Sequence, residues 1–62
     1  MSPTDCVKDR LAAFYHWNDR QSLEQAILVS RRQAVDLKEI RRWSLKEGMA
    51  EKLAVFRKSL KT

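Results

Sequence analysis

Apolar residues recur at the spacing of an α-helix near the end of this chain, and similar spacing returns further upstream. Met49, Leu53, Phe56 and Leu60 stand at positions i, i+4, i+7 and i+11, so their side chains fall on one face of a helix. The sequence has no strand-like alternation of apolar and polar residues and no Asn-Gly or Asp-Gly hairpin turn. The pattern therefore predicts an all-α fold.

Residues that favour helix ends divide this pattern into segments. Ser2 precedes a proline and can cap a first helix, and either Asn18 or Asp19 can cap a second. Asp36, with a glutamate three positions later, forms the clearest N-cap, and Gly48 suits the left-handed position after a helix end. We therefore predict a single helical domain, 1–62, built as a small bundle of about four short helices. The predicted helices span residues 3–16, 19–32, 37–47 and 49–60.

The expected core consists of the positions that recur on one face of each predicted helix. They are Val7, Leu11 and Phe14 in the first helix, Leu23, Ala26, Ile27 and Ser30 in the second, Leu37, Ile40 and either Trp43 or Ser44 in the third, and the four residues named above in the last. A domain this short buries only about 60% of the surface that its unfolded chain exposes. Because apolar residues make up 44% of the sequence, we expect some apolar surface to stay exposed and to mediate self-association or docking on another protein.

Composition limits the class of protein. At 44% apolar and 34% charged residues, the chain is too hydrophobic for a disordered segment and too highly charged for a membrane span. Its longest apolar run falls far short of the ~20 residues of a membrane helix, and the N-terminus lacks a basic-then-apolar signal pattern. We therefore expect a cytoplasmic protein. The single cysteine agrees with this expectation, since small secreted domains usually carry several disulfides.

No group of residues in the sequence makes a complete catalytic or metal site. His16 is the only histidine and Cys6 the only cysteine, whereas a zinc site needs three or four ligands. Gly48 is the only glycine, which excludes a glycine-rich phosphate loop. We predict no catalytic residue, no metal site, no cofactor and no enzymatic activity for the chain by itself.

The excess of positive charge lies in the second half of the chain. Residues 32–62 carry nine basic and four acidic side chains, which account for the net charge of +5. One face of the third predicted helix carries four of these cations, and two arginines before that helix can extend the patch. The six residues are Lys38, Arg41, Arg42, Lys46, Arg31 and Arg32. They are predicted contacts for an acidic protein or for nucleic-acid phosphates, although solvated helix faces are also rich in lysine and arginine.

The two tryptophans lead to different expectations. Trp43 stands beside the apolar positions of the third helix and is expected in the core. Trp17 stands at a helix end among polar residues. Because tryptophan is enriched at binding hot spots, Trp17 is the predicted anchor for a partner.

Three stretches of the sequence carry a resemblance to a known family. Residues 2–11, 15–20 and 35–48 resemble the C-terminal helical part of nucleotidyltransferase-fold proteins of the abortive-infection and toxin-antitoxin type. The resemblance implies that Lys8 and Asp19 match family positions close to the nucleotide site. The family's catalytic signature, a Gly-Ser turn followed by paired aspartates on a neighbouring strand, is absent from this sequence.

These observations lead to three hypotheses of function. The first is a non-catalytic helical interaction module that docks on itself or on a nucleotidyltransferase-like partner. The alternative is a small basic nucleic-acid-binding protein that uses the basic face of the third helix. The third is a split enzyme, active only with a partner that supplies the catalytic half.

Overall fold

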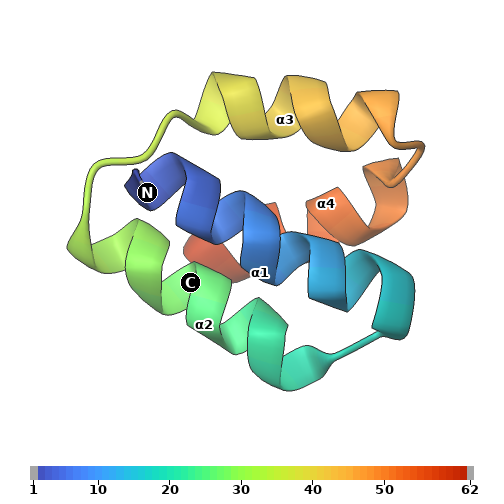
Figure 1. The fold of residues 1–62 in the computed structure, drawn as a ribbon, viewed down its shortest axis with the longest axis horizontal. Helices are drawn as coiled ribbons and strands as arrows, with labels where there is room; N and C mark the ends of the chain where they lie inside the picture. The colour runs from blue at the N-terminus through green and yellow to red at the C-terminus, as the bar shows by residue number, and fades with distance from the viewer. Residues whose placement is uncertain (1, 62) are drawn as a thin grey trace.

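A computed structural model describes residues 2–61 as four helices joined by short connections (Figure 1). The helices are α1 (Pro3–Trp17), α2 (Arg20–Arg32), α3 (Leu37–Lys46) and α4 (Ala50–Lys61). This part of the chain contains no strand, so the expected all-α fold is confirmed. Every helix end lies within one residue of the bound expected from the sequence.

The helix ends are capped largely as the sequence predicts. Ser2 and Asp36 each accept a hydrogen bond from the backbone amide three positions later, at 3.1 and 3.0 Å. Of the two candidates for the second cap, Asp19 caps α2, whereas Asn18 ends α1 in a left-handed conformation with φ 55°. Gly48 turns the chain between α3 and α4 with φ 73°, a conformation that side chains disfavour.

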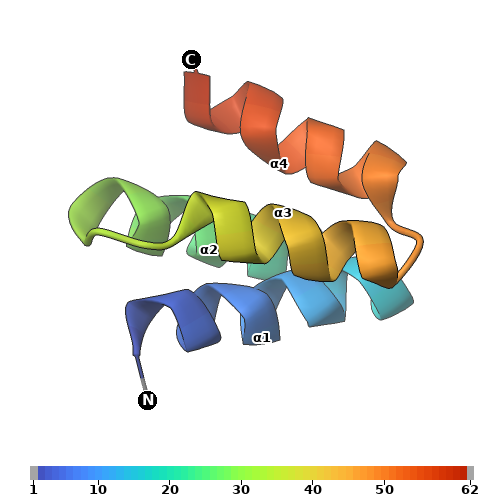
Figure 2. The same ribbon diagram turned by 90° about the horizontal axis from the view of Figure 1, so that it is seen from above.

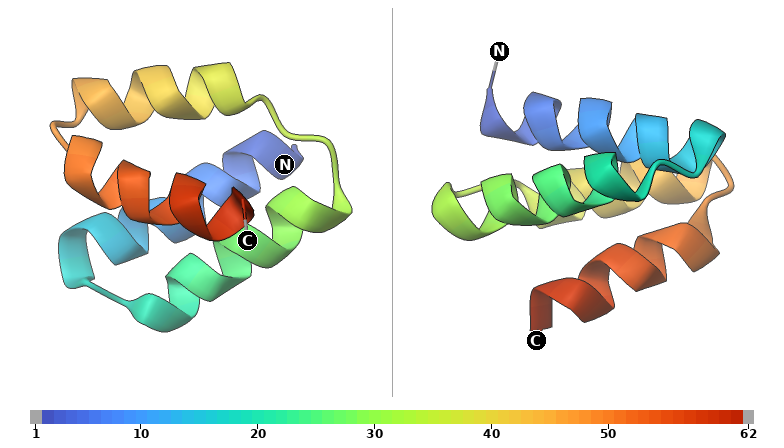
Figure 3. Two further views of the ribbon diagram at one scale, coloured as in Figure 1. Left: turned by 180° about the vertical axis from the view of Figure 1, so that it is seen from behind. Right: turned by 90° about the horizontal axis from the view of Figure 1, so that it is seen from below.

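The helices pack as an antiparallel pair with two further helices against it. α1 and α2 run antiparallel along most of their lengths, α3 lies against α1, and α4 contacts both α2 and α3 (Figure 1). α4 leaves the turn next to the end of α3 and then diverges from that helix (Figures 2 and 3). The two helices are therefore closest at their shared turn and further apart at the start of α3.

One apolar core lies between the four helices. Its buried members are Val7, Leu11, Phe14, Tyr15, Leu23, Ala26, Ile40, Leu53 and Phe56, and its partly buried neighbours include Ile27, Trp43, Met49 and Leu60. Most of the residues expected to face inward are therefore in the core or packed against it. Leu37 does not fit that expectation, since it is 50% exposed. Leu37 lines a hollow between α3 and α4. The two helices have separated at this end (Figure 2).

A buried polar pair joins α1 to α3. The hydroxyl groups of Tyr15 and Ser44 lie 2.8 Å apart, and both side chains are almost fully buried. Trp43 stacks on the Tyr15 ring with 5.6 Å between the ring centroids. This hydrogen bond gives both buried hydroxyl groups a partner inside the core. The contact therefore holds α3 in one position on α1.

Lys52 joins α4 to the C-terminal end of α1. Its ammonium group donates hydrogen bonds to the carbonyl oxygens of Tyr15 at 2.8 Å and Phe14 at 3.3 Å. The same nitrogen lies 5.4 Å from the centroid of the Phe14 ring. Both carbonyls belong to the last turn of α1, where a cation interacts favourably with the partial negative charge of the helix end. Lys52 therefore caps α1 from a distant part of the chain.

Replacing Lys52 by methionine should lower the free energy of unfolding by about 1–2 kcal/mol, because the carbonyl oxygens at the end of α1 lose a charged donor. Urea unfolding followed by tryptophan fluorescence measures this change. Lys58→Met is the matched control, since Lys58 is exposed on the same helix, and its effect should stay within a few tenths of a kcal/mol. Equal effects of the two substitutions would contradict the capping role.

Candidate functional site

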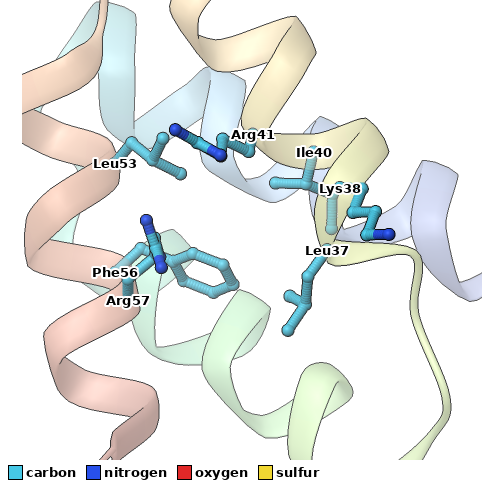
Figure 4. Close-up of a pocket in the computed structure, with 7 residues that line it drawn as sticks. All are labelled: Leu37, Lys38, Ile40, Arg41, Leu53, Phe56 and Arg57. Carbon is cyan, nitrogen blue, oxygen red and sulfur yellow. The ribbon is translucent and has the colours of Figure 1, made fainter.

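A groove of about 180 Å³ lies between the first half of α3 and the middle of α4 (Figure 4). Its lining residues are Leu37, Lys38, Ile40, Arg41, Leu53, Phe56 and Arg57. Three of the four apolar members are almost fully buried and form the floor, whereas Leu37 is half exposed at the mouth. We call this feature the basic groove.

Both walls of the basic groove are formed by residues that lie next to the buried apolar face of their helix. On α3, Leu37 and Arg41 lie beside the buried Ile40, on the side of that helix that faces α4. On α4, Arg57 directly follows the buried Phe56, about 100° further round the helix. Arginines at such positions can lay their aliphatic stems on apolar surface while the guanidinium groups stay in water. The groove is therefore apolar at its floor and cationic at its rim.

The rim carries only positive charge. Lys38, Arg41 and Arg57 line the groove together with apolar residues, and no acidic residue lines it. Within residues 2–61, none of these three cations forms an ion pair or a side-chain hydrogen bond. The acidic residue that α3 carries in its first turn, Glu39, pairs instead with Lys8 of α1 at 3.5 Å. The positive charge of the rim is therefore uncompensated.

The cations continue along the exposed face of α3. Lys38 and Arg41 also border a second hollow together with Arg42 and Leu45, and Leu45 is 47% exposed. Lys46 is exposed in the last turn of the same helix. The four cations predicted on α3 thus share one exposed face, and this face also contains leucine.

The two arginines at the end of α2 lie outside both hollows. The Arg31 guanidinium donates a hydrogen bond to the Ser59 carbonyl oxygen at 2.9 Å, in the last turn of α4, where a cation stabilises the helix end. Arg32 is exposed in the last turn of α2. Arg31 therefore has a structural partner, and neither arginine lines the basic groove.

The two positions implied by the family resemblance lie apart and have structural partners. Lys8 forms the ion pair with Glu39 described above. Asp19 caps α2 by accepting hydrogen bonds from the Ser22 hydroxyl and from the amides of Gln21 and Ser22. The hydrogen bond from the Ser22 hydroxyl is the largest of the effects that lower the pKa of the Asp19 carboxyl group, and the bonds from the two amides lower it further. The second half of α1 separates the two side chains, so they do not form one site.

The tryptophans differ as the sequence suggests. Trp43 is partly buried and packs against the core. Trp17 is 81% exposed at the end of α1 and does not line the basic groove. The role of partner anchor stays a prediction for Trp17.

Arg57 is the site residue that sequence reasoning missed. Its position next to the apolar face of α4 was a signal in the sequence, since a residue beside the apolar face of a helix lies at the edge of the surface against which that face packs. The sequence gives no indication that α4 places this side chain opposite the basic side of α3.

The described residues contain no cluster of three or more histidine, cysteine, aspartate or glutamate side chains that could hold a metal ion. Across residues 2–61, no helix combines the length and apolar character required to cross a membrane. No protein-family model, curated protein or solved structure matches this chain.

Proposed function

We propose that this chain is a non-catalytic helical interaction module that binds an acidic, amphipathic helix of a partner protein in the basic groove. The observation that carries the proposal is the half-exposed Leu37 beside three cations that have no ion-pair partner within residues 2–61. Covering exposed leucine surface contributes about 25 cal/mol per Å². The cations favour a partner whose own charge is negative.

A helix suits this groove because of the shape of its walls. Side chains on two neighbouring helices form ridges, and a third helix can lay its own ridge between them. The apolar face of such a helix presents anchor side chains at i, i+3 or i+4 and i+7. An anchor seated above Leu53 and Phe56 would extend the core of the domain outward.

The family resemblance suggests which protein supplies this helix. A nucleotidyltransferase-like domain that carries the catalytic residues is a partner that the resemblance implies, and this chain would contribute binding to it without contributing chemistry. A second copy of the chain is the other protein partner expected from the sequence. The net charge of +5 disfavours that choice, because two copies repel each other.

Nucleic-acid binding by α3 is the alternative, and four cations on one exposed face support it. Leu45 lies within this face and Leu37 lies at its edge, and neither exposed leucine gains anything from contact with phosphate. The basic face also lacks an asparagine or glutamine to read a base edge. We therefore expect only weak binding of duplex DNA or RNA, lost as salt rises to physiological concentration.

Selection from a library of displayed amphipathic helices tests the proposal. Selection on the immobilised chain should enrich helices with net negative charge, and Leu37→Asp should weaken their binding by at least about tenfold, because it removes apolar contact and adds a repelling charge. Isothermal titration calorimetry with the selected peptides measures the affinities. Leu28→Asp is the matched control, since Leu28 on α2 is 44% exposed and lies outside the groove.

Three results would contradict the proposal. The library could yield no binder, or the selected helices could bind Leu37→Asp as tightly as the unaltered chain. The third is DNA or RNA binding that persists at physiological salt and disappears in Arg41→Ala/Arg42→Ala, which would favour the nucleic-acid alternative.

A further inference from the structure

Two guanidinium groups approach the mouth of the basic groove from opposite walls. Arg41 extends from α3 towards Leu53, and Arg57 extends from α4 beside Phe56 (Figure 4). The Lys38 ammonium group points away from both (Figure 4). Neither arginine has an ion-pair partner in the part of the chain that the structure describes. Two like charges at one apolar mouth repel each other, and an anion bound between them would relieve that repulsion.

We infer that Arg41 and Arg57 form a two-arginine clamp for one carboxylate group of the partner helix. The inference rests on the proposed function and assigns the two residues that determine its specificity. A guanidinium group offers a planar fork of donors that matches the two oxygens of a carboxylate. Two forks that enter from different helices can hold both oxygens while the floor between them stays apolar.

The clamp defines the sequence pattern of the partner. An apolar side chain enters the groove above Leu53 and Phe56, and the clamped carboxylate must stand on the same face of the partner helix. Residues three or four positions apart share a helix face. The partner helix therefore carries an aspartate or glutamate one turn away from its apolar anchor.

The expected strength separates a clamp from an ordinary surface ion pair. An exposed ion pair changes affinity by at most about fivefold. The partner helix, however, covers the two guanidinium groups and excludes water from them, so loss of the carboxylate leaves two covered cations unpaired. Losses of this kind exceed those of rim charges, and we expect at least about tenfold weaker binding.

A double-mutant cycle tests the clamp with the selected helical peptides as probes. Each acidic residue of a peptide is replaced singly by its amide, and calorimetry measures binding to the unaltered chain and to Arg41→Gln/Arg57→Gln. One replacement should weaken binding to the unaltered chain by at least about tenfold and should have little further effect on the double variant. Arg42→Gln, exposed on α3 outside the groove, is the control and should keep the full effect of that replacement.

The outcomes distinguish the clamp from the proposed function. Peptides that lose affinity with Leu37→Asp but bind equally well with and without each carboxylate would overturn the clamp and leave the groove as the docking site. A carboxylate effect of the same size in the double variant would place its partner elsewhere and would also overturn the clamp. Absence of binding by every peptide would overturn both proposals together.

Discussion

Phe56→Ala should remove a large share of the free energy that keeps this chain folded. The Phe56 side chain is 0% exposed and belongs to the core that joins α4 to the other helices. Truncation of a buried phenylalanine costs about 3–5 kcal/mol, whereas a chain of this size has a total stability on the order of 3–9 kcal/mol. Circular dichroism during urea unfolding measures the loss.

Val55→Ala is the matched control for this substitution. Val55 precedes Phe56 on the same helix but is 40% exposed, so its truncation should change the free energy of unfolding by no more than about 0.5 kcal/mol. If Phe56→Ala melted within a degree or two of the unaltered protein, α4 would be peripheral to the core and the assignment of Phe56 would be wrong.

Tyr15→Phe should lower the free energy of unfolding by about 1–3 kcal/mol at neutral pH, because it leaves the buried Ser44 hydroxyl without its partner. Phenylalanine fills nearly the same volume, so the packing of the ring against Trp43 is kept. Urea unfolding of both proteins measures the difference. A difference in the free energy of unfolding below about 0.5 kcal/mol would contradict a buried hydrogen bond between the two hydroxyl groups.

Alkaline pH should remove the advantage of the tyrosine. Burial raises the pKa of Tyr15 above its ordinary value of 10.0, an effect that the hydrogen bond with Ser44 only partly opposes. A group whose pKa is higher in the folded state stabilises the fold below its unfolded pKa and loses that contribution as pH rises through its folded pKa. The stability difference between the unaltered protein and Tyr15→Phe should therefore shrink above pH ~10.

This pH dependence can be assigned to one side chain. Tyr15 is the only tyrosine, so phenolate absorbance reports its ionisation alone. Lysine deprotonation in the same range affects both proteins and cancels in the comparison. A stability difference that stays constant from neutral pH to well above pH ~10 would contradict the raised pKa.

The helices themselves were predictable because their signals are local. Asp36 accepts a hydrogen bond from an amide only three residues away. Gly48 has a positive φ at the end of α3, and this local signal for a helix end does not depend on where the chain goes next. The apolar residues on one face of α4 identified Leu53 and Phe56 as core, because the apolar face of an amphipathic helix is buried in any fold that contains the helix. None of these features depends on which helix becomes the neighbour.

The contacts between helices were not predictable in the same way. Tyr15 stands beside the expected stripe of α1 and becomes core only because α3 places Ser44 and Trp43 over it. Leu37 was expected inside the core and is half exposed, because the divergence of α4 from α3 is set by packing over the whole molecule. Arg57 could not be assigned to a site for the same reason.

The site was therefore predictable in part. The sequence located Lys38 and Arg41 on a basic face, and both line the groove. The sequence did not distinguish these two cations from Arg31, whose guanidinium donates a hydrogen bond to the Ser59 carbonyl oxygen of α4. Charge patterning finds exposed cations along one helix, whereas the identity of the free cations depends on the tertiary contacts.

The basic groove is tested most directly by mapping where a selected acidic helix binds. Amide chemical shifts of the isotope-labelled chain can be followed by nuclear magnetic resonance as the peptide is added, without any substitution in the protein. We expect the largest shifts in the first half of α3 and the middle of α4, around Leu37, Arg41 and Arg57. Shifts concentrated around Trp17 and the outer face of the α1–α2 pair, with the groove residues unchanged, would contradict the proposed site.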